Sequence, residues 1–258
     1  MRTVKLSPFG LEVWDVDIGA LSQAAADALA GLIAINRVVV FRNQSGGDSE
    51  LVSFLQQLGP LTFTAGETPV AGAPDLNVVS NLGRSTPPRS VFHTDTSYVA
   101  RPPAFTALRE VMLPTRGGQT VFSDQVAAFL ALPAAWRSGL ASCTVQHRTT
   151  GLDGKSQTQD HPLFRLHPVT AETALYLSTP ERCSHLSGVA PATSARLVSI
   201  LYRRSIRASN LYRHSWKKGD VVIWDNRLTM HQADHSDVDG DRVLHRGMVM
   251  GEQPIHAV

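Results

Sequence analysis

The sequence predicts a mostly β fold with helical insertions, of the sandwich or jelly-roll barrel class. Short runs rich in β-branched and aromatic residues recur along the chain, and the turns between them carry Pro and Gly, as at Pro102-Pro103 and Gly117-Gly118. Helix-forming stretches are few and do not alternate regularly with the strands, which argues against a doubly wound sheet. The 258 residues, 43% of them hydrophobic, can bury a sizeable core, and we expect a single domain over residues 1–258.

The first predicted elements are a helix, a strand and a second helix. Residues 21–35 are rich in helix formers and place Leu29, Leu32 and Ile33 at helical spacing, which predicts an amphipathic helix. The β-branched run of residues 37–42 predicts a buried strand. The second helix is expected over residues 49–58 and a third over residues 192–207. Further strands are predicted over residues 76–80, 104–113, 119–122, 144–148, 174–177, 220–224 and 242–250.

Charge and cysteine content narrow the range of partners. Lys and Arg number 24 against 22 Asp and Glu, and they are scattered apart from two short pairs, which favours a solvated surface over a nucleic-acid interface. Cys143 and Cys183 form no metal-type pair and indicate buried thiols in a reduced compartment. The N-terminus lacks the apolar region of a signal peptide, and no apolar run reaches the ~18 residues of a membrane span. We therefore expect a cytoplasmic protein without a membrane or nucleic-acid partner.

A His-x-Asp triplet, His93-Thr94-Asp95, is the first candidate metal-binding motif. In an extended segment, residues two apart project from the same face, so His93 and Asp95 can bind one metal ion together. Non-haem iron(II) oxygenases combine such a pair with a second His from elsewhere, which leaves three neighbouring positions for a co-substrate and O₂. A single short triplet is weak, because it also arises by chance in a chain with ten histidines.

Two rival metal patterns lie near the end of the chain. His235-Ser236-Asp237 repeats the triplet spacing, but it lies in a run of acidic and turn residues that favours a solvated loop. His231 and His235 have the spacing of a zinc-protease helix. That motif requires Glu after its first His, and here the residue is Gln232. The sequence therefore favours His93 and Asp95.

Two arginines follow the segment that ends at His231. Arg242 and Arg246 differ by four positions on a predicted strand, so both face the same side. A guanidinium group can hold a carboxylate with two parallel hydrogen bonds, which the point charge of Lys cannot do. One arginine can therefore bind the distal carboxylate of 2-oxoglutarate while the other end of that molecule chelates a metal. The simpler alternative is that both are surface arginines of an edge strand.

Taken together, these motifs resemble the taurine and 2,4-dichlorophenoxyacetate dioxygenase family. The resemblance covers nearly the whole chain, because residues 37–44 and 58–60 also resemble the N-terminal pattern of that family. It implies a double-stranded β-helix (jelly-roll) core, iron(II) as cofactor and 2-oxoglutarate as co-substrate. The motifs that carry it are, in order, His93-Thr94-Asp95, Pro102-Pro103, Gly117-Gly118-Gln119-Thr120, Ile223-Trp224-Asp225-Asn226-Arg227, His231 and Arg242-Val243-Leu244-His245-Arg246.

The resemblance implies a role for individual residues. His93, Asp95 and His231 match the iron ligands of the family, and Thr120 and Arg242 match the residues that bind the far carboxylate of 2-oxoglutarate. Related halogenases lack the carboxylate ligand, so the presence of Asp95 implies oxidation, through hydroxylation, desaturation or cleavage, and not chlorination. The implied partners are a small organic substrate and O₂, and homo-oligomers are common in the family.

The implied substrate contacts are less definite. Arg246 matches an arginine near the primary substrate, and with nearby Arg89 it indicates a substrate that carries an acidic group or is amino-acid-like. Trp224 is expected to form a wall of the site, or equally to be a core aromatic residue.

The sequence departs from the taurine-specific pattern at three places. In an ungapped alignment from Leu58, the sulfonate-binding His corresponds to Thr64, and the Trp that usually precedes the triplet is Phe92. Residues 178–182 replace an Asn-Glu-Gly-Phe stretch. The iron chemistry is expected to persist with a substrate other than taurine.

Two other protein classes share the metal ligands. A cupin-like metal-binding or sensor protein without turnover could keep the three ligands, but it would not need Thr120 and Arg242. A zinc hydrolase with two His and one Asp ligand is a further alternative. Metal content and the response to 2-oxoglutarate distinguish these classes.

Overall fold

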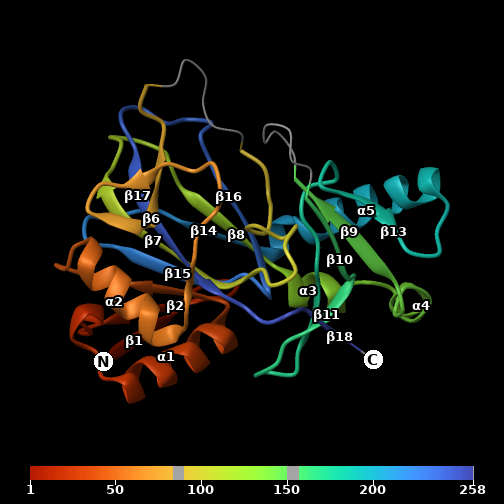
Figure 1. The fold of residues 1–258 in the computed structure, drawn as a ribbon, viewed down its shortest axis with the longest axis horizontal. Coiled ribbons are helices and arrows are strands. Elements are labelled where there is room, and N and C mark those ends of the chain that lie inside the picture. The colour runs from red at the N-terminus through yellow and green to blue at the C-terminus, as the bar shows by residue number, and fades with distance from the viewer. Residues whose placement is uncertain (84–89, 150–156, 258) are drawn as a thin grey trace.

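The computed structural model describes residues 1–83, 90–149 and 157–257. Its largest element is a nine-stranded sheet, antiparallel throughout except for the pair β2 and β3 (Figure 1). The strands follow the order β1 (Arg2–Lys5), β2 (Leu11–Trp14), β3 (Val38–Phe41), β15 (Val221–Asp225), β7 (Pro103–Met112), β17 (Val243–Met250), β6 (Ala73–Ser80) and β5 (Pro69–Val70), and β4 (Leu61–Thr62) also pairs with β17.

A three-stranded sheet packs against the inner face of the large one. It has the order β14 (Leu211–His214), β8 (Thr120–Asp124) and β16 (Thr229–Ala233). Phe122 from this sheet and Trp224 from the large sheet meet with ring centroids 5.2 Å apart in a buried apolar cluster that contains residues of both sheets. Two antiparallel sheets that enclose one core form a jelly roll.

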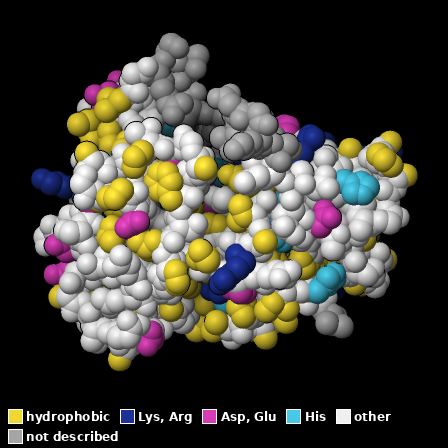
Figure 2. Space-filling model, viewed as in Figure 1, with side chains coloured by type: hydrophobic (Ala, Val, Ile, Leu, Met, Phe, Trp, Pro, Cys, Tyr) yellow, Lys and Arg dark blue, Asp and Glu magenta, His cyan; other side chains and the backbone are white. Residues whose placement is uncertain are grey.

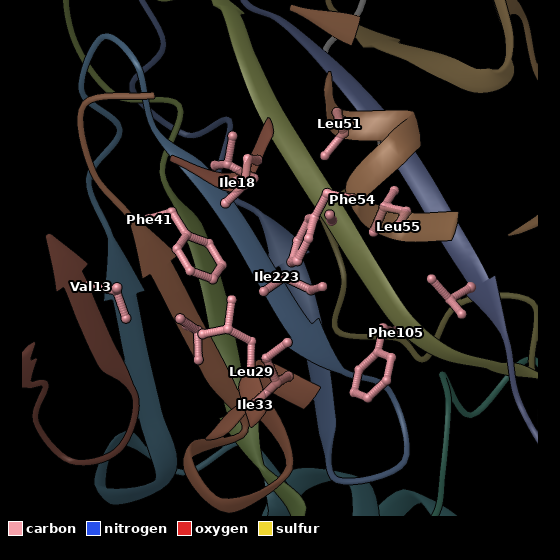
Figure 3. Packing of buried hydrophobic residues seen from close by; sticks show 14 of the residues in the cluster. Val13, Ile18, Leu29, Ile33, Phe41, Leu51, Phe54, Leu55, Phe105 and Ile223 are labelled. Carbon is pink, nitrogen blue, oxygen red and sulfur yellow. The ribbon is translucent and has the colours of Figure 1, made fainter. Parts of the chain in front are cut away.

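Helices α1 (Gln23–Asn36) and α2 (Asp48–Leu58) cover the outer face of the large sheet. The Ser22 side chain caps α1 by accepting a hydrogen bond from the Ala25 backbone N–H at 3.3 Å, as N-cap residues commonly do. Figure 3 shows Leu29 and Ile33 of α1 and Phe54 of α2 packed toward the sheet. This helical layer shields one face of the sheet, while the opposite face is left for the inner core and the site.

A further layer lies beside the jelly roll (Figure 1). Its sheets have the orders β10–β9–β13 and β12–β11–β18, and α5 packs on β13. The bounds of these elements and of the remaining helices are β9 (Thr144–Arg148), β10 (Thr158–Pro162), β11 (Phe164–Leu166), β12 (Thr173–Leu175), β13 (Cys183–Leu186), β18 (Ile255–His256), α3 (Gln125–Leu130), α4 (Ala134–Gly139), α5 (Pro191–Ser205), η1 (Ile18–Ala20) and η2 (Ala208–Asn210).

The fold class predicted from the sequence is confirmed. The three predicted helices correspond to α1, α2 and α5, and each predicted strand overlaps a strand of the structure. The strands that the sequence did not reveal include β10, β13 and β16, which are short and rich in polar residues. Cys143 and Cys183 are buried free thiols, as expected.

The face in Figure 2 carries side chains of mixed character. Lys and Arg side chains are few and separated there, and hydrophobic side chains are interspersed with polar ones. In the part of the chain that the structure describes, no helix is both long enough and apolar enough to cross a membrane.

Candidate active site

A cavity opens between the two sheets of the jelly roll. Its volume is about 830 Å³, including the part open to solvent. The large sheet contributes residues of β6, β7 and β17, and the small sheet contributes residues of β8 and β16. The lining residues are Glu67, Val78, Val79, Ser80, His93, Leu108, Thr120, His231, Ala233, His235, Arg242 and Arg246.

The predicted metal ligands come together at this cavity. His93 forms an isolated antiparallel bridge with His231 of β16, with both backbone N–H to O distances at 2.9 Å. Asp95 follows at the start of a turn, and its oxygens lie 3.6 Å from Nε2 of His93 and 3.9 Å from Nε2 of His231. One ligand atom from each of the three residues lies within 4.8 Å of the other two. The bridge thus brings two distant segments into one candidate metal site.

The protonation of these residues suits a divalent cation. Nδ1 of His93 lies 3.0 Å from the carbonyl oxygen of Val91, which can only accept, so Nδ1 donates and Nε2 is the ring nitrogen on the side of Asp95. Burial lowers the pKa of His231 to about 3, although nearby Asp95 acts to raise it. Burial opposes ionisation of Asp95, but the two histidines and Arg246 outweigh it and hold the pKa of the carboxyl below its usual range. Two histidine nitrogens and an ionised carboxylate form the ligand set preferred by non-haem iron(II).

Arg242 and Thr120 lie together in the wall of the same cavity. Arg242 is 1% exposed, and it donates from Nε to the Gly118 carbonyl at 2.8 Å and from Nη2 to the Thr120 hydroxyl at 3.2 Å. Within the described ranges it forms no ion pair, and burial lowers its pKa to about 10. Gly118 has a φ of +72°, and a Cβ there would lie 3.0 Å from Cδ of Arg242, which explains the glycine. A buried guanidinium without a carboxylate partner fits an anionic ligand.

Arg246 has a different environment, because protein groups occupy all three of its nitrogens. Nε donates to Oδ1 of Asn77 at 3.1 Å, Nη1 donates to Oδ1 of Asp95 at 3.2 Å, and Nη2 lies 3.4 Å from Oε1 of Glu67. No sequence motif indicates Asn77 or Glu67 as residues of the site. Asn77 becomes recognisable only through the strand register, which places it opposite Arg246.

Trp224 is not among the residues that line the cavity. It is fully buried in β15, and its ring lies behind His231 with centroids 4.5 Å apart. Its burial corresponds to the core-aromatic alternative, and its ring packs against the imidazole of His231. Arg89, the other predicted substrate residue, lies outside the described residues.

The structure excludes one rival metal pattern and places His235 of the other at the cavity. His231 lies on a strand, so the helical pairing of His231 with His235 is wrong. Ser236 and Asp237 are exposed in a turn, as a solvated loop predicts, but His235 is only partly exposed and lines the cavity. Thr64, at the position of the sulfonate-binding His, pairs its hydroxyl with that of Thr96 at 3.0 Å.

Comparison with known proteins identifies the family. Residues 2–248 match the model of the taurine catabolism dioxygenase TauD, TfdA family. An alpha-ketoglutarate-dependent sulfonate dioxygenase of Saccharomyces cerevisiae is 30% identical over 95% of this chain, which covers 65% of that protein. An alpha-ketoglutarate-dependent sulfate ester dioxygenase of Pseudomonas putida is 27% identical over 99% of this chain and 87% of its own length.

Two solved structures also resemble this chain. A putative alpha-ketoglutarate-dependent taurine dioxygenase from Burkholderia xenovorans superposes with a TM-score of 0.89 at 33% identity, covering 99% of this chain and 94% of that one. AAD-2 in complex with Mn(II) and N-oxalylglycine superposes with a TM-score of 0.85 at 26% identity, covering 98% of each chain.

These relatives confirm the predicted enzyme class, a 2-oxoglutarate-dependent dioxygenase, and its cofactors, iron(II) and 2-oxoglutarate. The jelly-roll core implied by the resemblance is confirmed by the same superpositions. The chain therefore belongs to the taurine catabolism dioxygenase TauD, TfdA family.

Proposed function

We propose that this protein, acting as a single catalytic domain, hydroxylates a C–H bond of a small acidic or amino-acid-like molecule. His93, Asp95 and His231 would hold iron(II), and Thr120 and Arg242 would bind the distal carboxylate of 2-oxoglutarate. When bound, iron(II) and 2-oxoglutarate would activate O₂, the oxidant, so that substrate, O₂ and 2-oxoglutarate become the hydroxylated product, succinate and CO₂.

Arg242 is the observation that carries the proposal. A buried guanidinium without a carboxylate partner is costly unless an anion joins it. It lines the same cavity as His93 and His231, so a dicarboxylate that contacts both Arg242 and the metal site explains its position. A protein that bound only a metal ion would have no use for this arginine, and a zinc hydrolase would not either.

The rest of the cavity supports a small substrate with an acidic group. Val78 and Leu108 provide apolar surface, and Arg246 provides positive charge beside Asp95. The protein groups here bind and orient the substrate, and the apolar wall excludes water from the reacting C–H. Glu67 partly neutralises Arg246, so a substrate acid must compete with Glu67 or bring an ammonium group to it.

Anaerobic titration of iron(II) and 2-oxoglutarate tests the proposal. A weak visible charge-transfer band is expected when the keto acid chelates iron, and Arg242→Ala should raise the Kd of 2-oxoglutarate at least about 30-fold, because a buried charge pair loses roughly 2 kcal/mol or more. Arg203→Ala, on the exposed face of α5, is the matched control and should leave the Kd unchanged. Iron binding without the band, or equal effects of both variants, would contradict the proposal.

A further inference from the structure

A chain of buried hydrogen bonds connects the Trp-Asp-Asn-Arg motif to Asp95. Nε1 of Trp224 donates to Oδ1 of Asn226 at 2.9 Å, and Nδ2 of Asn226 lies 2.6 Å from Oγ1 of Thr106. Oγ1 of Thr106 lies 2.9 Å from Oδ2 of Asp95. All four residues are 3% exposed or less, so water does not compete for these bonds.

Chemistry gives this chain one direction. An indole N–H can only donate, so the atom of Asn226 that faces Trp224 must be its carbonyl oxygen, and its NH₂ must then point to Thr106. The Thr106 oxygen accepts that bond and has one hydrogen of its own to give. The acceptor within reach is Oδ2 of Asp95. The donor in each hydrogen bond is therefore determined by the preceding bond, from Trp224 to Asp95.

The other carboxylate oxygen of Asp95 is held separately. Oδ1 accepts from Nη1 of Arg246 at 3.2 Å. The carboxylate thus has a donor on each oxygen, which restricts rotation about its Cβ–Cγ bond. Residues that fix a ligand in this way commonly change metal affinity by about 10- to 100-fold when they are replaced.

We infer that Trp224, Asn226 and Thr106 form a directional relay that positions Asp95 for metal binding. They act as positioning residues, because in the structure none of them lines the cavity. The inference rests on the proposed function only in taking Asp95 as a metal ligand. It assigns a role to Asn226, a motif residue that does not line the cavity.

Mn(II) titration of the metal-free protein tests the relay without catalysis. Thr106→Val keeps the side-chain shape but removes the hydroxyl, and it should raise the Kd of Mn(II) by about 10-fold or more. Thr106→Ser restores the donor and should return the Kd to near the wild-type value. If the methyl group matters and the hydroxyl does not, Thr106→Val should bind Mn(II) like wild type and Thr106→Ser should bind it more weakly.

Asn226→Asp tests the direction of the bonds. Its carboxylate still accepts from Trp224 but also accepts from Thr106, so the Thr106 hydroxyl turns away from Asp95. The expected result is a 10-fold or greater loss of Mn(II) affinity. The added negative charge alone would strengthen cation binding, so a loss isolates the hydrogen-bond direction. Combining it with Thr106→Val should cost no more than the larger single effect, since both break the same link.

The outcomes separate the two proposals. Circular dichroism verifies that each variant is folded before titration. If wild type binds Mn(II) and both Thr106→Val and Asn226→Asp bind it equally well, the relay is wrong and the proposed function stands. If folded wild type does not bind Mn(II), or if Asp95→Ala binds it as well as wild type does, the metal assignment fails and the relay fails with it.

Discussion

At the level of single residues, the two arginines of the cavity differ in what they can still bind. Arg242 has no acidic partner in the described part of the chain, whereas Arg246 contacts both Asp95 and Glu67. The Asp95 side chain is 4% exposed and the Glu67 side chain 41%, so Glu67 is the partner that can move away at low cost. Arg242 therefore suits a co-substrate carboxylate that displaces no acidic protein group, and Arg246 suits a substrate acid that displaces Glu67.

Replacing Glu67 should change substrate affinity. Glu67→Gln removes the carboxylate that competes for Arg246, and because a partly exposed ion pair is worth up to about 1 kcal/mol, plain acids should bind up to about fivefold more tightly. Binding of a sulfonate, a sulfate ester and a phenoxyacetate can be measured through 2-oxoglutarate-dependent O₂ uptake. Glu172→Gln is the control, because Glu172 pairs with Arg37 and does not line the cavity. Unchanged or weaker acid binding in Glu67→Gln alone would show that Glu67 does not compete.

At the level of elements, the sequence predicts those whose pattern is local. The β-branched run of β3 and the helical spacing in α1 are recognisable without tertiary contacts. β16 is not, because Thr-Met-His-Gln-Ala has no alternation, and its strand conformation depends on pairing with β8. The same holds for the site: its sequence motifs indicated His93 and Arg242, but Thr106 approaches Asp95 only after β7 has taken its place in the sheet.

Two glycines in different elements should respond oppositely to substitution by alanine. Gly247 of β17 faces α2, where a Cβ would lie 2.3 Å from Leu55 and 2.7 Å from Leu76, so Gly247→Ala overpacks the core and should cost about 1–3 kcal/mol. Gly31, within α1, has no atom within 4 Å of its Cβ position, so Gly31→Ala should stabilise the protein by about 0.5–1 kcal/mol. Urea unfolding measures both values. A stabilising Gly247→Ala would mean that Leu55 and Leu76 can repack without cost.

Across the whole molecule, buried histidines connect stability to pH. His161 is 2% exposed, and burial lowers its pKa to about 4, although a hydrogen bond to the Val99 carbonyl acts to raise it. His147, whose ring centroid lies 5.3 Å from that of His161, has its pKa lowered well below the usual value by burial. The unfolded chain therefore binds more protons than the folded protein below about pH 6.5. This sign means that stability falls as the pH is lowered from 6.5 toward 4.

Asp48 and Asp220 affect the stability of the protein at a lower pH than the buried histidines do. Burial acts to raise the pKa of each carboxyl, but hydrogen bonds to His245 and Arg109 lower that of Asp48, and bonds to His214 and Arg42 lower that of Asp220. Their contribution is present above the unfolded pKa of about 4 and is lost below it. The interval between pH 6.5 and 4 therefore reports mainly on the histidines.

His161→Gln should make the metal-free protein less sensitive to acid. An amide can still donate to the Val99 carbonyl, but it does not titrate, so the variant removes one proton from the difference between the unfolded and folded states. Between pH 6 and 4.5, the slope of the unfolding free energy against pH should decrease by up to about 1.4 kcal/mol per pH unit. His185→Gln, at an exposed histidine of β13, should leave the slope unchanged. Urea unfolding with EDTA at several pH values measures these slopes, and parallel curves for wild type and His161→Gln would show that His161 is charged in the folded protein or uncharged in both states.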